Sequence, residues 1–103
     1  MRVLVIEAKE RNIHLHDTEG QLHDLQALVG GYIQTGAPAQ LRLEGLELLV
    51  NEEGLLRGLP VNENLWPFFF VGTAVVVRVK GEEFVSLTDD DVLFMDKWLS
   101  GLK

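Results

Sequence analysis

The chain has 103 residues, 47% of them hydrophobic, which is enough for one domain spanning residues 1–103 with a single core. This length excludes a two-domain enzyme, and the absence of cysteine excludes a disulfide scaffold and a thiolate metal site. The net charge of −7 opposes non-specific binding to nucleic acid, because phosphate-binding surfaces need clustered Lys and Arg.

Two strands are expected at the N-terminus. The β-branched run from Val3 to Ile6 has no helical period and predicts a buried strand. Residues 13–16 alternate between apolar and polar side chains, which indicates a half-buried strand that forms a hairpin with the first. Thr18 and Gln21 have the spacing of a capping box and predict a helix entry, but Gly20 weakens the box and leaves open a start one or two residues later.

The first helix is expected from Leu22 to Val29, where apolar residues recur at i, i+3 and i+7. Gly30 and Gly31 follow this stripe, and a glycine just past the last turn closes a helix by adopting a left-handed conformation. Residues 32–35 then predict a short strand, and residues 36–39 predict a loop.

The middle of the chain predicts two further strands. The apolar residues at 46–50 lead into Asn51–Gly54, where the glycine is expected to supply the positive φ of a tight hairpin turn. Residues 62–66 are expected to form one helical turn. Residues 68–79 predict the strongest strand, which lies centrally in the sheet because it is apolar on both faces.

A short strand at Phe84–Val85 and a last helix complete the predicted fold. Thr88 is expected to cap this helix, and the aspartates at 89–91 complement the helix dipole. Its apolar stripe comprises Val92, Met95, Leu99 and Leu102. The sum is an α+β fold, with a mostly antiparallel sheet of about five or six strands and two helices on one face.

No stretch of the chain predicts a membrane segment. The apolar run at the N-terminus is too short for a signal-peptide core. The uncharged stretch from Leu65 to Val77 is shorter than a spanning helix and is interrupted by Pro67 and Gly72. With no cysteine, the chain fits a reducing compartment, so we expect a cytoplasmic protein that does not contact a membrane.

The sequence predicts no catalytic residues, no metal site and no cofactor. His14 and His16 share one side of a strand and His23 follows nearby, but no closed ligand set accompanies them. The consecutive aspartates at 89–91 point in different directions on a helix, so they cannot easily converge on a metal ion. No serine lies in a G-x-S-x-G elbow, and no phosphate-binding glycine motif is present.

The aromatic run from Leu65 to Phe70 is the most suggestive candidate for a binding surface. Three successive phenylalanines in a strand cannot all face inward, so Trp66 and Phe69 are expected at a surface that binds a protein partner or a second copy as a homodimer. Tryptophan is also enriched at interface hot spots. The alternative is that both sheet faces are covered within the monomer and the aromatic side chains fill the core.

Three phrases in the chain have a family resemblance: Leu28-Val29-Gly30-Gly31-Tyr32-Ile33, Asn51-Glu52-Glu53-Gly54 and Gly58-Leu59-Pro60-Val61-Asn62. Together they resemble a family of small domains of unknown function that is frequent in bacteriophage, plasmid and bacterial genomes. The resemblance implies a cargo gene of mobile elements, often a companion of anti-restriction genes, and it carries no assigned chemistry. Glu63 stands where such relatives commonly carry a basic residue, which argues against anion binding there.

Two classes of function follow. The first is a non-catalytic acidic interaction protein, a mobile-element accessory or anti-defence factor that binds another protein, such as a DNA-binding or host-defence protein. The alternative is a domain that binds or sequesters a small nucleotide-derived ligand. That alternative would use the backbone near Gly58 to Asn62, Trp66 for stacking, and Arg57 or Arg78 for phosphate.

Overall fold

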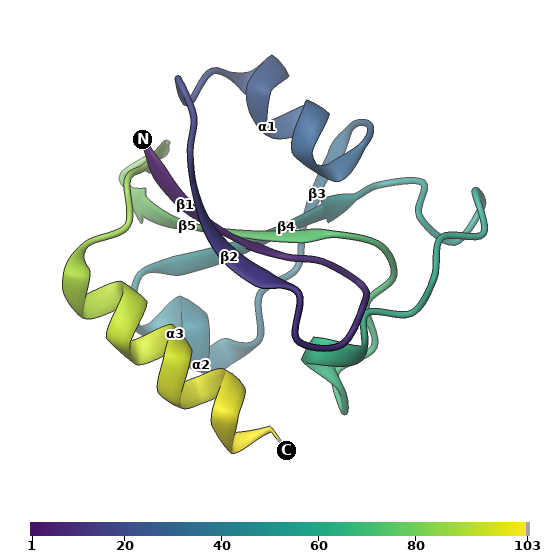
Figure 1. Ribbon diagram of the computed structural model, residues 1–103. Coiled ribbons are helices and arrows are strands. Elements are labelled where there is room, and N and C mark those ends of the chain that lie inside the picture. The colour runs from purple at the N-terminus through teal and green to yellow at the C-terminus, as the bar shows by residue number, and fades with distance from the viewer. Residues whose placement is uncertain (103) are drawn as a thin grey trace.

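A computed structural model describes residues 1–102 of the chain (Figure 1). The elements follow in the order β1 (Arg2–Ile6), β2 (Ile13–Asp17), α1 (Leu22–Val29), β3 (Ile33–Thr35), α2 (Ala39–Leu43), β4 (Leu46–Asn51), the 3-10 turn η1 (Glu63–Leu65), β5 (Ala74–Lys80), β6 (Glu83–Val85) and α3 (Asp89–Gly101). The predicted α+β class is confirmed, with six antiparallel strands and two long helices beside the short α2.

The sheet is ordered β2-β1-β5-β4-β3, so β5 lies at its centre as its apolar sequence predicts. The expected hairpin of β1 and β2 is also confirmed. Arg78 in β5 lies opposite Leu46 of β4 and also opposite Val85 of β6, so β6 occupies the same side of β5 as β1, further along the strand. The path of the sheet therefore ends at β2 and β3, and within residues 1–102 β6 pairs with β5 alone.

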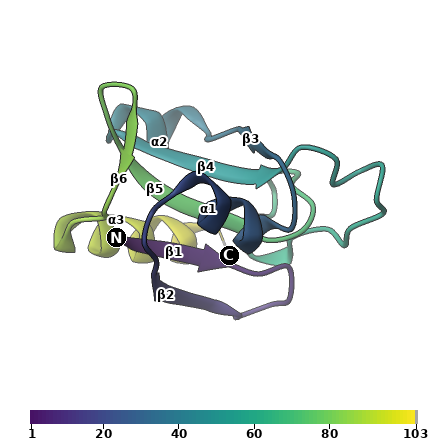
Figure 2. The ribbon, with the colours of Figure 1, turned by 90° about the horizontal axis from the view of Figure 1, so that it is seen from above.

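The helices cover opposite faces of the sheet, so the prediction that they share one face is wrong. On one face, α1 buries Leu25 and Val29 against a valine-rich layer from β1 and β5 (Figure 1; Figure 2 gives the view from above). On the other face, α2 and α3 bury Leu41, Met95 and Leu99. The physical reason is that β1, β4 and β5 carry apolar side chains on both faces, and each face must be removed from water.

The ends of the helices agree only partly with expectation. Gly30 closes α1 with a φ of 82°, and the Thr88 hydroxyl accepts a hydrogen bond from the Asp91 amide at 3.1 Å, so both of these predictions are confirmed. The predicted capping box of Thr18 is wrong. The amide of Thr18 donates to Met1 at the end of the hairpin, and α1 begins after Gln21, whose amide donates to the Asp24 carboxylate at 3.1 Å.

The short helix α2 lies where the sequence predicts the end of a loop and an unassigned segment. It has five residues and buries one of them, Leu41, so it presents too few positions for a helical stripe to be visible in the sequence. The expected single turn near residues 62–66 is confirmed as η1.

The segment between β4 and β5 is the largest departure from expectation. Instead of a tight hairpin, residues 52–73, called the excursion here, extend beyond the end of the sheet (Figure 1). Gly54 is not among the glycines with positive φ; a Cβ there would lie 2.7 Å from Val71 Cγ2, so close packing requires the glycine. The predicted strand at 68–79 begins only at Ala74, because Gly72 has a φ of 75° that interrupts extended backbone.

Candidate functional site

The inner side of the excursion is a buried polar corner centred on Asn62. This side chain is 0% exposed and its amide donates to the carbonyl oxygens of Ile6 and Gly72, both at 2.9 Å. Its side-chain oxygen accepts a hydrogen bond from the backbone amide of Asn64 at 3.1 Å and so caps η1. Every polar atom of Asn62 thus serves the fold, and Asn62 is not free to bind a ligand.

Asn64 extends this corner to the β1–β2 turn. Its amide donates to the carbonyl oxygens of Glu7 at 2.8 Å and Lys9 at 2.7 Å, and its side-chain oxygen accepts from the Arg11 amide at 2.8 Å. Arg11 has a φ of 65°, a conformation that non-glycine residues rarely adopt. Asn64 therefore fastens the excursion to a turn that lies more than fifty residues earlier in the chain.

Asn51 has a similar role at the start of the excursion. It is buried; its side-chain amide donates to the Val29 carbonyl at 3.2 Å, and its side-chain oxygen accepts from the Glu53 amide at 2.8 Å. A Cβ on Gly31 would lie 3.0 Å from the same amide nitrogen. The Gly-Gly and Asn-Glu-Glu-Gly phrases therefore meet in space and hold the end of α1 against the end of β4.

Arg78, which is partly exposed, forms an ion pair with the buried Asp91. Its Nε and Nη2 atoms lie 2.7 and 2.6 Å from the two carboxylate oxygens of Asp91, whose side chain is 5% exposed, and Nη2 also donates to the Glu44 carbonyl. Hydrogen bonding from Arg78 lowers the pKa of Asp91, and the Thr88 amide and hydroxyl act in the same direction. The pair links α3 to β5 and to the end of α2. These contacts already use the Arg78 guanidinium, which the small-ligand alternative would need to bind phosphate.

Arg57 is partly exposed and makes longer contacts. Its Nη2 lies 3.3 Å from the Glu53 carboxylate, and its Nη1 donates to the Gly30 carbonyl at 3.2 Å. Arg57, Asn62 and Arg78 therefore each make contacts with different parts of the fold. The structure does not bring these three side chains together around one cavity.

Trp66 and Phe69 are both exposed, by 61% and 59%, but they line different hollows. Trp66 faces a hollow beside Glu63 and Leu102, whereas Phe69 lines a groove next to β3. Of the neighbouring phenylalanines, Phe68 stacks on Trp98 of α3 at 5.6 Å between ring centroids, and Phe70 packs against the core. The three phenylalanines precede β5, so the expectation that they alternate across the sheet is wrong.

The groove at Phe69 carries the two most exposed large apolar side chains of the excursion. Leu55 is 71% exposed and Leu56 is 87% exposed, and both line this groove with Phe69, next to the edge strand β3. The groove has a volume of about 470 Å³. We call Leu55, Leu56 and Phe69 the excursion patch. The adjacent leucines at 55 and 56, in a segment with no strand or helix period to bury them, are the sequence signal that could have indicated it.

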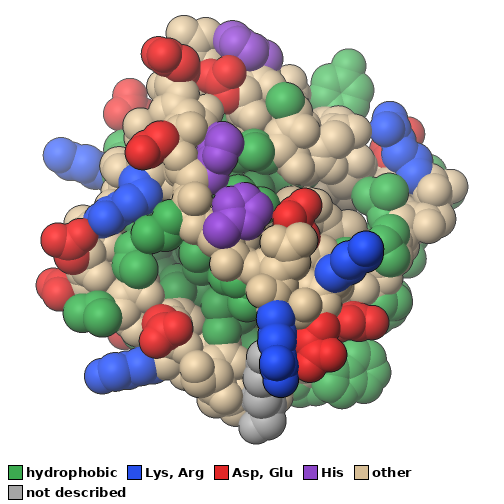
Figure 3. Space-filling view, viewed as in Figure 1, with side chains coloured by type: hydrophobic (Ala, Val, Ile, Leu, Met, Phe, Trp, Pro, Cys, Tyr) green, Lys and Arg blue, Asp and Glu red, His purple; other side chains and the backbone are tan. Residues whose placement is uncertain are grey.

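Within residues 1–102, no group of three His, Asp or Glu side chains is arranged to hold a metal ion. His14 and His16 lie exposed on β2, and Figure 3 shows the histidine side chains as separate surface groups above a hollow lined by hydrophobic atoms. No helix of the described chain is long and apolar enough to cross a membrane.

A family model described as "Domain of unknown function (DUF3846)" matches residues 1–101. No curated protein and no solved structure matches the chain. The match covers nearly the whole chain, including the polar corner and the excursion patch.

Proposed function

The chain belongs to the DUF3846 family of domains of unknown function, and from that premise we propose that it is a non-catalytic interaction protein that binds another protein through the excursion patch. The observation that carries the proposal is the exposure of Leu55, Leu56 and Phe69 on one groove. Burial of such side chains contributes about 1.5–3 kcal/mol each, so covering all three would support a specific association.

The charge of the chain favours a partner that is not acidic. With a net charge of −7, two copies repel one another, whereas a basic protein is attracted. The proposed partner is therefore another protein, such as a DNA-binding or host-defence protein, and the chain would act as an accessory or anti-defence factor of a mobile element in the cytoplasm. A two-fold homodimer through the same patch is the competing form of this proposal.

The internal contacts of the polar residues favour protein binding over the small-ligand alternative. Asn62 and Arg78 use their strongest donors within the fold. Ser86, the serine that precedes the last helix, accepts a hydrogen bond from the Arg2 amide at 2.8 Å and so holds β6 beside β1. These residues are explained by architecture, and the apolar excursion patch is the feature that architecture leaves unexplained.

The proposal is tested with a double variant, Leu55→Ser with Phe69→Ser, and a matched control, Leu22→Ser with Leu93→Ser. Both variants remove two exposed apolar side chains, but the control changes α1 and α3 instead of the excursion. Affinity capture from host lysate is compared with light scattering across a concentration series. We expect the excursion variant to lose the captured partner and the control to retain it, with similar thermal melts.

Two outcomes contradict the proposal. One is equal capture by the excursion variant and the control. The other is a wild-type protein that captures no partner and remains monomeric at every concentration. A concentration-dependent dimer that the excursion variant abolishes would instead identify a second copy as the occupant.

A further inference from the structure

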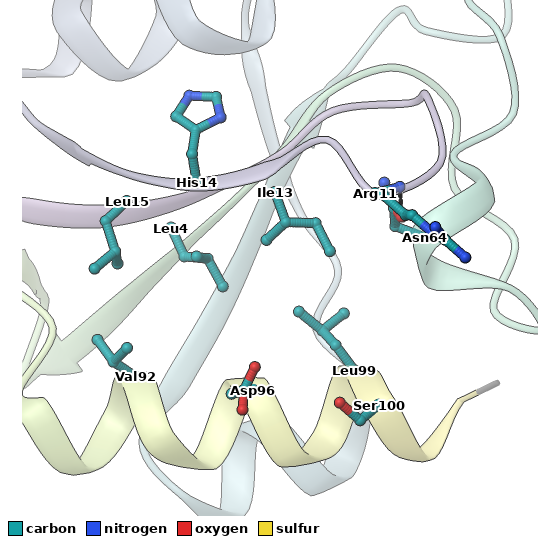
Figure 4. A pocket seen from close by; sticks show the side chains of 10 residues that line it. All are labelled: Leu4, Arg11, Ile13, His14, Leu15, Asn64, Val92, Asp96, Leu99 and Ser100. Atoms are coloured by element: carbon teal, nitrogen blue, oxygen red, sulfur yellow. Dashed lines mark hydrogen bonds between the residues drawn. The ribbon is translucent and has the colours of Figure 1, made fainter.

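A second groove lies far from the excursion patch in the sequence, between the β1–β2 hairpin and α3. Ile13 and Leu15 of β2 point toward Val92 and Leu99 of α3 across this groove (Figure 4). Its volume is about 490 Å³, which lies within the usual range of ligand-binding pockets. The hydrophobic hollow visible in Figure 3 lies in this part of the molecule.

The hydrogen bonds at the two ends of the hairpin determine which backbone groups of β2 are free. Met1 and Thr18 exchange both of their backbone hydrogen bonds, at 2.8 and 2.9 Å. At the other end, the Glu7 amide donates to the Asn12 carbonyl at 2.9 Å. Because bonded and non-bonded pairs alternate in an antiparallel ladder, these two pairs fix the pattern between them.

By this alternation, His14 and His16 direct their backbone groups toward β1, and Ile13, Leu15 and Asp17 direct theirs toward the outside of the sheet. Among residues 1–102, β1 is the single strand that pairs with β2. The side chains of Ile13 and Leu15 also lie on the α3 face, whereas His14 points to the opposite face (Figure 4). The outward backbone groups therefore border the apolar groove.

The outer edge of β2 has neither a proline nor a bulge, and its carboxylate, Asp17, stands only at the end of the strand. Native edges are often shortened or carry proline, inward charges or bulges. β2 has five residues in regular register with β1, and its α3 face carries Ile13 and Leu15. A helix could fill an apolar groove, but only an extended chain also satisfies a row of strand amides and carbonyls.

The charge at the groove indicates the chemistry of that extended chain. Asp96 of α3 lies on the groove side, between Val92 and Leu99, and makes no ion pair with any of residues 1–102 (Figure 4). Arg11, which also lines the groove, lies at its far end beside Asn64. A basic side chain on the incoming strand would complement Asp96, and the net charge of −7 disfavours a second copy as occupant.

We propose that the edge of β2 binds an extended segment of another protein as a further strand. Alternate apolar side chains of that segment enter the groove between Leu15 and Leu99, and a Lys or Arg side chain contacts Asp96. The free strand groups give affinity, and the groove and carboxylate give sequence preference. This surface is separate from the excursion patch, so the inference does not rest on the function proposed above.

The first test is selection of binders from a phage-displayed library of random linear peptides, using the full chain as bait. We expect enriched peptides with apolar residues at every second position and at least one Lys or Arg. Amide NMR signals of Ile13, Leu15 and Leu99 should shift when the synthetic peptide is added. Enrichment of helical or acidic peptides, shifts at Leu55 and Phe69 instead, or no enrichment at all would each overturn the proposal.

Protein variants then test the two sides of the groove. Leu15→Arg should weaken peptide binding by about tenfold or more, because it removes an apolar contact and adds a repulsive charge. Leu22→Arg, the same change on the exposed surface of α1, should leave affinity unchanged. Asp96→Asn should weaken binding by about threefold and Asp90→Asn should not. Equal effects within either pair contradict the assignment.

A peptide variant tests strand addition without changing the protein. N-methylation of the peptide amides that would face β2 removes their hydrogen bonds and should abolish binding. Retained binding would mean that the groove accepts side chains without a strand, which overturns the proposed mode. The Leu55→Ser, Phe69→Ser protein should bind the peptide normally, so loss of one surface is distinguished from loss of the other.

Discussion

The excursion contains two regions of opposite character. Around Asn62 and Asn64, buried side-chain amides donate to backbone at the end of β1 and in the β1–β2 turn, whereas Leu55, Leu56 and Phe69 are exposed on the outside. Of the phrases singled out in the sequence, Gly58–Asn62 contributes Asn62 to the first region, and Asn51–Gly54 contributes Asn51, which holds the end of α1. The asparagines of these phrases therefore specify architecture, whereas the exposed Leu55 and Leu56 lie between the phrases and Phe69 follows them.

The contrast predicts that the internally paired residues control stability. The largest effect is expected for Asp91→Ala, which leaves Arg78 without its partner and removes the side chain that contacts Thr88 at the start of α3. Loss of one member of a buried pair costs roughly 3–5 kcal/mol, and Asp91→Ala should approach the lower end because Arg78 is partly exposed. Urea unfolding measures this, with Asp90→Ala as the control; equal destabilisation would contradict the role of the pair.

The same pair predicts a pH dependence. Because Arg78 lowers the pKa of Asp91, the stability from this group is fully present above the unfolded pKa of about 4 and is lost as the pH falls through the lower folded value. Unfolding free energies measured from neutral to acidic pH should therefore fall more steeply for the wild type than for Asp91→Ala. Parallel curves would show that Asp91 does not titrate in this way.

A smaller effect is expected for Asn62→Ala, which breaks the polar corner directly. The change leaves the carbonyl oxygens of Ile6 and Gly72 without their donor and should destabilise the fold by about 2 kcal/mol. Asn12→Ala serves as the control, since the Asn12 side chain is exposed. Thermal melting of both variants decides the question, and a wild-type melt for Asn62→Ala would mean that the corner is not structural.

The smallest effect on stability is expected in the exposed excursion patch. Leu56→Ser should change the free energy of unfolding by no more than about 0.5 kcal/mol, because the side chain is almost fully exposed. It should nevertheless weaken capture of the proposed protein partner. A clearly lowered melting temperature would place Leu56 with the architectural residues and remove the distinction between the two regions.

The binding residues expected from the sequence agree only partly with the structure. Trp66 and Phe69 were expected to be exposed and are exposed, although on separate hollows. Asn62 and Arg78 were also candidates, but a polar residue that serves a ligand and one that serves the fold have the same local sequence. Leu55 and Leu56 were missed because their segment has no period to interpret.

The sequence by itself determined the features that depend on neighbouring residues. The apolar run of β1, the two-sided hydrophobicity of β5 and the Thr88 cap of α3 are local patterns, and each predicted its element. Tertiary structure alone decided which face each helix covers, where the excursion lies and whether Asn62 is buried. These outcomes depend on partners distant in the chain: Asn62 donates to Ile6 across 56 positions, and no local period records such a contact.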